Sequence, residues 1–300
     1  MSTSELRPLL PVFGDLDLNL PTNGRPTSKK TFEDGSKFKI EIPSVENPEM
    51  LETVIAASKG HGVQVSRVSQ GSGIMMLKSD EILRMLELGT QNSIEICLFV
   101  GPRAEWDIGS ESNSPAGHAI SATLRGSNPL IHSLKEIIFA CNLGLRCILV
   151  ADLGLLKAIQ LLKQSGDLPL GLKIKTSAMM PSSNPGTIKM LEDFGATSVN
   201  VAVDLTIQDL SDLRQTIDAN LDLYIEAPDS LGGVLRYYDI PEIVRVASPV
   251  FLKFGLRNSP SFYPYGLQLR TVALAATEEK VRRAAIGLEI YHRFSREANG

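Results

Sequence analysis

Residues 147–201 read CILVADLGLLKAIQLLKQSGDLPLGLKIKTSAMMPSSNPGTIKMLEDFGATSVNV and alternate between short apolar runs and longer segments of helical period. The apolar runs occupy residues 147–151, 172–176 and 198–201, and the helical segments occupy 153–164 and 185–194. Asn184 followed by Pro185 is typical of a helix start, because the asparagine caps the first turn and proline fits its first position. This alternation predicts consecutive βα units and therefore a parallel sheet.

The same rhythm extends in both directions, from Lys37 to the end of the chain. The predicted strands are residues 38–42, 63–68, 94–100, 147–151, 172–176, 198–201, 221–226 and 250–254. The predicted helices are residues 48–59, 80–88, 133–143, 153–164, 185–194, 207–217, 240–247 and 278–294. Eight parallel strands can close on themselves, and no GxGxxG follows the first strand as a doubly wound open sheet would require. We therefore predict an α/β fold, a (β/α)8 TIM barrel.

Two segments depart from this rhythm. Residues 1–36 are rich in Pro, Gly, Ser and Thr, and we predict an N-terminal arm or tail there, with one TIM-barrel domain over 37–300. Apolar residues between Leu9 and Phe13 make the arm a candidate contact in a homo-oligomer. Residues 101–132 form a connection far longer than a usual βα loop, and we predict a lid or specificity loop, with a surface insertion as the alternative.

Composition favours a small-molecule partner over nucleic acid or a membrane. The net charge is −4, so no basic surplus calls for nucleic acid or an anionic membrane surface. Three cysteines without CxxC spacing argue against a disulfide framework and for a reducing compartment. No signal-peptide pattern and no apolar stretch of about 18 residues is visible, and we expect a cytoplasmic protein.

Charged residues alternate with apolar ones along several predicted strands. In a barrel the outward positions meet the helices, so polar residues at alternate positions face the interior. This predicts, near the C-terminal rim, the group Glu41, Arg67, Asp152, Lys175, Asn200, Glu226 and Lys253. Each buried ion costs several kcal/mol unless it is paired, so we expect a charged functional pocket. A self-satisfied network of the two glutamates with the two lysines is the alternative.

Several catalytic roles are open to these groups. A lysine beside other cations has a lowered pKa and can form a Schiff base; Lys175 is the first candidate and Lys253 the second. The same lysine could stay charged and stabilise an enolate or a carboxylate. Glu226 or Glu41 could act as the acid or base, and Asp152 and His118, the latter in the long loop, complete the candidate catalytic groups.

Substrate binding is expected at the ends of the last two strands, where barrels often hold phosphate. Gly232 and Gly233 permit close approach of an anion to the backbone, and Arg257 could clamp it with two hydrogen bonds. The predicted substrate-binding residues are Arg67, Arg103, Asn200, Gly232, Gly233 and Arg257.

A metal would find its ligands among Glu41, Asp152, Glu226 and His118, which suit Mg, Mn or Zn. No HxH or HExxH spacing supports one, and we assign neither a metal nor a required cofactor.

The middle of the chain resembles the collagenase-like peptidase family. The resemblance covers roughly residues 145–215 and lies in VADLGLL (150–156), TSAMMPSSN (176–184), LEDFGAT (191–197) and DLT (204–206). It implies a barrel-type domain and a peptidase-like hydrolase. The family's cysteine-rich signature with a His-Gly pair is replaced here by YIEAPD (224–229), and the four cysteines of its iron–sulfur members are not present.

Three functions follow from these observations. The first, which we favour, is a lyase or isomerase acting on a small carboxylated or phosphorylated carbonyl compound. The second is a peptidase-like hydrolase whose water is activated by carboxylates or a metal. The third is a non-catalytic binding or assembly subunit, in which the long loop and the arm contact other proteins.

Overall fold

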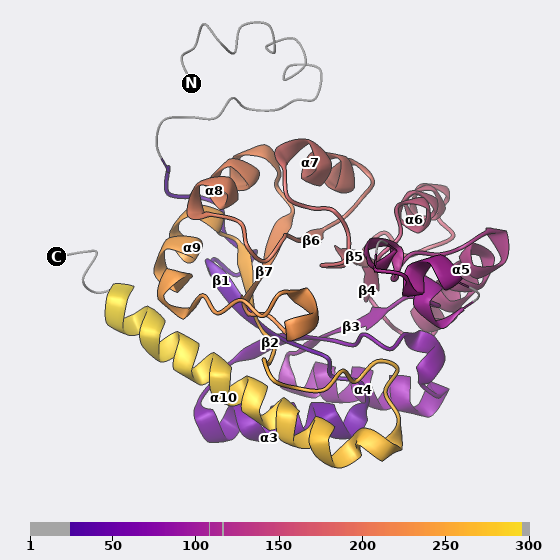
Figure 1. The fold of residues 1–300 in the computed structure, drawn as a ribbon, viewed down its shortest axis with the longest axis horizontal. Helices are drawn as coiled ribbons and strands as arrows, with labels where there is room; N and C mark the ends of the chain where they lie inside the picture. The colour runs from indigo at the N-terminus through magenta and orange to yellow at the C-terminus, as the bar shows by residue number, and fades with distance from the viewer. Residues whose placement is uncertain (1–24, 108, 116, 296–300) are drawn as a thin grey trace, which may run out of the picture.

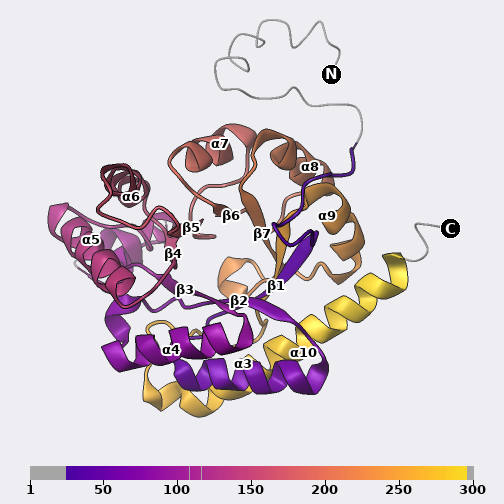
Figure 2. The same ribbon diagram turned by 180° about the vertical axis from the view of Figure 1, so that it is seen from behind.

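The structure is a computed structural model that describes residues 25–295 apart from 108 and 116. The apolar stretch Leu9–Phe13 of the predicted arm lies outside these residues. Eight parallel strands form a closed barrel in sequence order, β1 pairing with both β2 and β8, as Figures 1 and 2 show from opposite sides. The predicted TIM barrel is confirmed.

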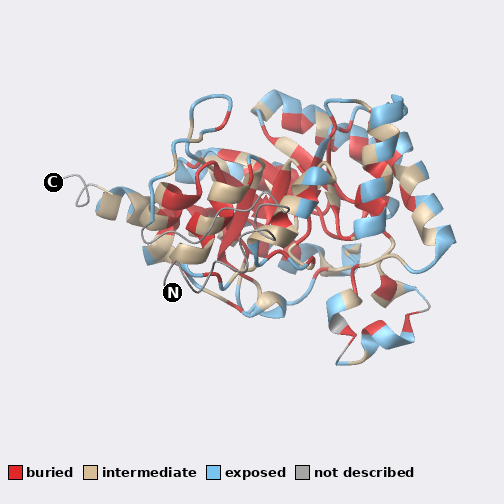
Figure 3. Ribbon diagram, turned by 90° about the horizontal axis from the view of Figure 1, so that it is seen from above, coloured by how far each residue is buried: buried red, intermediate tan, exposed pale blue. Residues whose placement is uncertain are grey.

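The strands are short and the helices lie outside them. The strands are β1 (Phe38–Pro43), β2 (Val65–Ser69), β3 (Glu95–Phe99), β4 (Cys147–Val150), β5 (Lys173–Thr176), β6 (Ser198–Asn200), β7 (Asn220–Glu226) and β8 (Val250–Phe254). The helices are α3 (Pro48–His61), α4 (Ser79–Asn92), α5 (Ser127–Asn142), α6 (Leu153–Ser165), α7 (Pro185–Asp193), α8 (Ile207–Thr216), α9 (Ile240–Ala247) and α10 (Arg270–Ser295). Figure 3 shows the buried strands surrounded by helices whose outer faces are exposed.

Local sequence signals set the helix starts. The side chain of Asn184 accepts a hydrogen bond from the backbone N–H of Thr187 at 2.9 Å, and Pro185 occupies the first turn of α7, as the sequence predicts. Thr206 and Asp209 form a reciprocal capping box at the start of α8.

Helix α10 is longer than its sequence pattern predicts. It begins at Arg270 rather than near residue 278, and it packs along α3 beside the barrel (Figure 1). The first turns are buried through Ala273, Ala276 and Thr277, small side chains that allow close packing but give no apolar stripe to recognise. Lys280, within the predicted part of this helix, points inward and reaches the carbonyl of Pro43 at the C-terminal end of β1.

Residues 25–36 pack on the barrel rather than extending from it. Ser28 donates from its backbone N–H to the carbonyl of Arg245 at 2.8 Å and from its hydroxyl to the carbonyl of Ser248 at 2.5 Å. The Phe32 ring meets the Phe251 ring edge-on at 5.0 Å, inside the N-terminal end of the barrel. Figure 2 shows this segment in indigo, running past α8 and α9 to β1.

Within the part of the chain that is described, no helix is both long and apolar enough to span a membrane.

We expect Phe32→Ala to lower the free energy of unfolding by about 3 kcal/mol, because the ring is 8 % exposed and its removal leaves a cavity against Phe251. Denaturant unfolding of the full chain measures this. The control is Leu170→Ala, whose side chain is 80 % exposed and should change stability by less than about 0.5 kcal/mol. Equal stabilities for the two variants would show that the segment does not contribute to the folded barrel.

Candidate functional site

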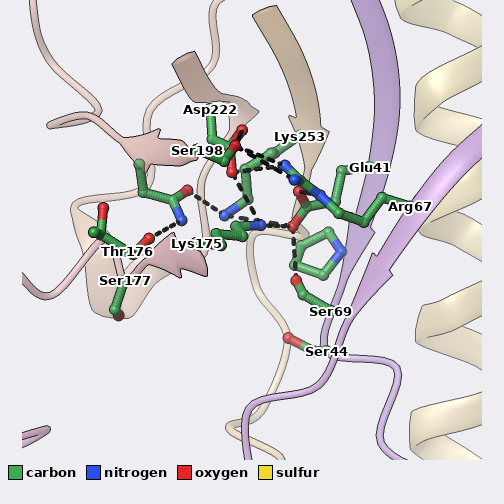
Figure 4. A network of polar contacts seen from close by, with 12 residues as sticks. Glu41, Ser44, Arg67, Ser69, Lys175, Thr176, Ser177, Ser198, Asp222 and Lys253 are labelled. Carbon is green, nitrogen blue, oxygen red and sulfur yellow. Dashed lines mark hydrogen bonds and ion pairs between the residues drawn. The ribbon is translucent and has the colours of Figure 1, made fainter. Parts of the chain in front are cut away.

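The centre of the barrel is ionic where most barrels are apolar. Glu41 on β1 is fully buried and accepts hydrogen bonds from three side chains (Figure 4). Arg67 Nε donates to its Oε2 at 2.7 Å, and Ser69 Oγ donates to its Oε1 at 2.7 Å. The third donor is Lys175 Nζ, which also contacts Oε1. Two side chains of β2 and one of β5 therefore meet at this carboxylate of β1.

A second carboxylate, Asp222 on β7, balances the first. Its Oδ2 lies 2.7 Å from Arg67 Nη2 and 3.2 Å from Lys175 Nζ, and its Oδ1 accepts from Ser198 Oγ at 2.6 Å. Arg67 and Lys175 therefore each bridge Glu41 and Asp222. Asp222 lies near the start of its strand and is not among the predicted site residues. The structure shows that it completes the network.

The charges in this network do not cancel. Three fully or almost fully buried cations, Arg67, Lys175 and Lys253, face two fully buried carboxylates, Glu41 and Asp222, so the buried groups carry one positive charge in excess. Glu95, which is partly exposed, lies 3.6 Å from Arg67 and is shared with Lys173. Burial alone would raise the pKa of Glu41, but the charges of Arg67, Lys175 and Lys253 outweigh it and hold that pKa well below its ordinary value. Burial lowers the pKa of Lys253, and its neighbouring carboxylates only partly oppose this.

Of the three cations in this network, Lys253 has the weakest ionic pairing. Its Nζ lies 3.7 Å from Glu41 Oε1, donates to Asn200 Oδ1 at 2.5 Å and lies 4.0 Å from the centre of the Tyr224 ring. Asn200 in turn donates from Nδ2 to the carbonyl of Thr176 at 2.6 Å, which fixes its amide so that the oxygen faces the amine. Neutral neighbours therefore surround most of this amine.

A cavity of about 400 Å³ lies above this amine, at the C-terminal ends of the strands. Lys253, Asn200, Tyr224 and Ser69 line it, whereas Lys175, Glu41, Arg67 and Asp222 lie beneath its floor and do not. This is the face on which barrel enzymes carry their active sites. Of the two lysines proposed from the sequence, therefore, only Lys253 lines the cavity.

Two loops form the roof of the cavity. Arg103, Glu105, Trp106 and Ser121 come from the long connection between β3 and α5, so this segment does cover the cavity. Residues 259–263 come from the connection after β8, which sequence analysis did not single out.

The two roof loops meet at Arg103, whose guanidinium carbon lies 5.0 Å from the centre of the Tyr263 ring. The loop after β2, residues 69–73, closes a third side. Its backbone N–H groups at Gly71 and Ser72 already bind the buried carboxylate of Glu46, at 3.0 and 2.9 Å.

Lys280, on α10, is a cavity residue that sequence analysis missed. It is 3 % exposed, lines the cavity and donates to the carbonyls of Pro43 at 2.9 Å and Ser44 at 3.4 Å. Burial lowers its pKa to about 8. The lysine lies in a helix whose early turns have no apolar period, so no signal in the sequence marked it as inward.

Glu226, a candidate acid or base, is not in this cavity. The register between β7 and β8 shifts by one residue between Tyr224 and Glu226. Tyr224 pairs with the inward-facing Lys253, and Glu226 pairs with the next residue of β8, Phe254. Its carboxylate turns toward the helices, where Tyr237 donates to Oε2 at 2.5 Å and Arg283 of α10 lies 3.5 Å away. The bulge explains why strict alternation placed it inside.

The remaining candidates also lie outside the cavity. Asp152 caps α6, accepting from the N–H of Leu155 at 2.8 Å. Arg257 pairs with Asp229 at 3.1 Å, and neither it nor the two glycines at 232 and 233 lines the cavity. His118 begins the short helix His118–Ile120, but its side chain is outside what the structure describes.

The three described metal-ligand candidates do not come together. Glu41 is bound by cations, Asp152 caps a helix and Glu226 faces α10. Among the described residues, no group of three or more His, Cys, Asp or Glu side chains is placed to hold a metal ion.

A family comparison agrees with this barrel over part of the chain. The chain matches the model of Peptidase family U32 over residues 122–227. The match contains the segment in which the sequence resembles collagenase-like peptidases and confirms that partial resemblance. It runs from the end of the β3–α5 connection to the residue after β7, and it therefore includes Lys175, Asn200 and Asp222 but not Lys253.

Solved structures share the fold at low identity. The U32 peptidase Mk0906 is 15 % identical, with a TM-score of 0.44 over 77 % of this chain and 97 % of that one. A candidate fructose-1,6-biphosphate aldolase from Coccidioides immitis is 11 % identical, with a TM-score of 0.50 over 85 % and 93 %. A dihydrodipicolinate synthase is 13 % identical, with a TM-score of 0.47 over 87 % and 79 %. No curated protein matches the sequence.

We expect Glu41→Gln to lower the free energy of unfolding by about 3–5 kcal/mol, because it leaves Arg67 and Lys175 buried beside a neutral amide. Since the folded pKa of Glu41 lies below 4.5, its ionisation stabilises the fold above that pH, and this contribution is lost as the pH falls. The variant should therefore also lose less stability than the wild type on acidification. Urea unfolding from neutral to acid pH tests both effects.

The matched control is Glu52→Gln, which removes a surface pair with Arg84 and should change stability by less than about 1 kcal/mol. A Glu41 variant as stable as this control would mean that the interior network is not a constraint on the fold.

Proposed function

We propose that the protein is an enzyme of the lyase or isomerase type that acts on a small carboxylated or phosphorylated carbonyl compound through the amine of Lys253. One observation carries this proposal. Lys253 presents a buried amine to a cavity of about 400 Å³, and its nearest carboxylate oxygen lies 3.7 Å away. Burial that lowers the pKa of an amine raises its neutral, nucleophilic fraction near neutral pH.

The proposed chemistry begins with Schiff-base formation. The nitrogen of neutral Lys253 forms a bond to the carbonyl carbon of the substrate, and the carbonyl oxygen leaves as water after taking up one proton from that nitrogen and one from solvent. The product is an iminium ion, which can accept the electron pair of an adjacent C–C or C–H bond as that bond breaks. The iminium carries the same single positive charge as protonated Lys253, so Asn200 Oδ1 and Glu41 stabilise both.

Lys175 supports this reaction without reacting. It is fully buried, contacts both Glu41 and Asp222, and does not line the cavity. Its charge helps to keep Glu41 ionised beneath Lys253, which holds negative charge near the nitrogen that becomes positive. This reverses the order in which the sequence ranked the two lysines.

The charge of the cavity wall favours an anionic substrate. Besides Lys253, which reacts in its neutral form, the lining cations are Arg103 and Lys280, and the lining carboxylates are Glu105 and Asp229. Asp229 is engaged by Arg257 at 3.1 Å, a residue outside the lining. The wall therefore has an excess of positive charge, which a carboxylate or phosphate on the substrate would balance.

Peptide hydrolysis is the second candidate, and the match to the U32 model over residues 122–227 favours it. Activation of water would require a carboxylate free to accept a proton. Glu41 and Asp222 are both held by cations, and the two lining carboxylates, Asp229 and Glu105, are paired with Arg257 and Arg103. Release of amino groups from a casein or gelatin digest by the purified protein, lost in Glu41→Gln but kept in Lys253→Met, would replace the lyase proposal with this one.

We expect borohydride reduction in the presence of succinic semialdehyde or glycolaldehyde phosphate to attach a stable adduct to Lys253, detected by intact mass and peptide mapping. Lys253→Met should abolish the adduct. The control, Lys173→Met, removes a lysine at the opposite end of the barrel that is 61 % exposed and paired with Glu95, and it should leave trapping unchanged. An adduct on Lys175, or none on any lysine, would remove the Schiff-base proposal.

We expect the rate of adduct formation to rise with pH and to reach half its maximum below pH 10.5, the ordinary lysine value, because burial depresses the pKa of Lys253. Stopped reactions from pH 6 to 11 give the midpoint. In Asn200→Ala the amine loses the acceptor that stabilises its charged form, so the midpoint should move lower still. A midpoint at or above the ordinary value would contradict a desolvated amine.

A further inference from the structure

We propose that Arg103 and Lys280 form an anion subsite in the upper wall of the cavity, which binds the carboxylate or phosphate of the compound whose carbonyl reacts at Lys253. The link to Lys253 rests on the proposed function, whereas the binding of an anion does not. The two cations come from distant parts of the chain, the β3–α5 loop and α10, yet both line the same cavity.

Arg103 is held rigidly but is not satisfied. Its guanidinium carbon lies 4.5 Å from the ring centre of Phe99 and 5.1 Å from that of Trp106, in addition to Tyr263. Nη2 donates to the carbonyl of Gly71 at 2.8 Å, but Nε has no hydrogen-bond partner among the described residues.

Among the described residues, Glu105 is the one carboxylate paired with Arg103, and it lies 3.5 Å from Nη1, longer than a good hydrogen bond. A planar guanidinium with unused donors is the group that best fits a carboxylate or a phosphate. The aromatic rings around it fix the plane in which those donors lie, so little conformational entropy is lost when an anion binds.

Lys280 also lacks a charged partner. Its two acceptors are the uncharged carbonyls of Pro43 and Ser44, and no described carboxylate forms an ion pair with it. An ammonium group has three N–H donors, so two carbonyls leave one for a ligand. The nearby Glu46 is a weak counter-ion, since burial raises its pKa and its oxygens already accept from Gly71 and Ser72.

Ser44 and Tyr263 connect the two cations. The Tyr263 hydroxyl and the Ser44 hydroxyl lie 2.5 Å apart, the Tyr263 ring faces Arg103, and the Ser44 carbonyl accepts from Lys280. A Cβ at Gly71 would lie 2.4 Å from the Tyr263 ring, so this wall leaves no space for a side chain there. Arg103 and Lys280 therefore belong to one packed wall of the cavity.

The single tryptophan of the chain, Trp106, lines the cavity beside Arg103 and makes the subsite observable. We expect inorganic phosphate or malonate to change its fluorescence saturably in the wild type. Arg103→Met and Lys280→Met should each weaken binding at least tenfold, about the loss of one charge-assisted hydrogen bond. Arg125→Met, in the same loop and paired with Glu111 at 3.6 Å, is the matched control and should bind as the wild type does.

Matched carbonyl probes test whether the subsite serves the reaction at Lys253. Succinic semialdehyde is compared with butanal, and glycolaldehyde phosphate with glycolaldehyde, by the concentration that gives half-maximal borohydride trapping. In one pair, we expect the anionic probe to reach half-maximal trapping at a concentration at least tenfold lower than its neutral counterpart. Which pair shows this difference tells whether the subsite prefers a carboxylate or a phosphate. Arg103→Met and Lys280→Met should remove that preference, whereas the control Arg125→Met should keep it. Trapping of the neutral probe by each variant shows that the variant is folded.

The outcomes separate this proposal from the proposed function. Saturable, Arg103-dependent anion binding without any adduct would leave the subsite standing and reject Schiff-base chemistry. Adducts that form equally with anionic and neutral probes, with no effect of either anion on Trp106, would reject the subsite and leave the chemistry standing. Binding that is unchanged in both variants would also overturn the subsite.

Discussion

The pairing of Glu41 and Asp222 with Arg67 and Lys175 is the constraint on which the rest of the barrel depends. These side chains come from β1, β7, β2 and β5, so the network fixes four strands relative to one another at the barrel axis. Its members lose hydration on burial, and only accurate mutual placement offsets that cost. Such a core favours one defined arrangement of the strands over maximal stability. It also places fixed charges beneath Lys253.

The alternation of apolar and polar residues along the strands was enough to predict the barrel and much of this ionic network. It brought Glu41, Arg67, Lys175, Asn200 and Lys253 to the interior, because each stands next to an apolar residue that needs the helix layer. It failed where the backbone departs from regular pairing. The bulge before Glu226 cannot be read from residue types, and Asp152 looked like a strand-end acid although its oxygen is used by a helix N-terminus.

Residues contributed by loops and by α10 were harder to predict for a different reason. A helical lysine such as Lys280 is usually solvated, and only the tertiary approach of α10 to the barrel makes it a wall of the cavity. Pairing partners are similarly invisible in one sequence, since Lys175 and Lys253 look alike until the distance of each to a carboxylate is known. Whether a lysine is structural or reactive therefore depends on its neighbours in three dimensions and cannot be read from the sequence pattern.

The contact of residues 25–36 with the far end of the chain bears on how the protein assembles. Ser28 is 220 positions away from Ser248, and β1 closes the ring only against β8. During synthesis from the N-terminus, Phe32 and the open edge of β1 have no partner until nearly the whole polypeptide has emerged. Loop closure over such a separation slows folding and prolongs the exposure of an unpaired strand. A chaperone that shields this early edge would therefore increase the yield of closed barrels more than one that acts on the finished molecule.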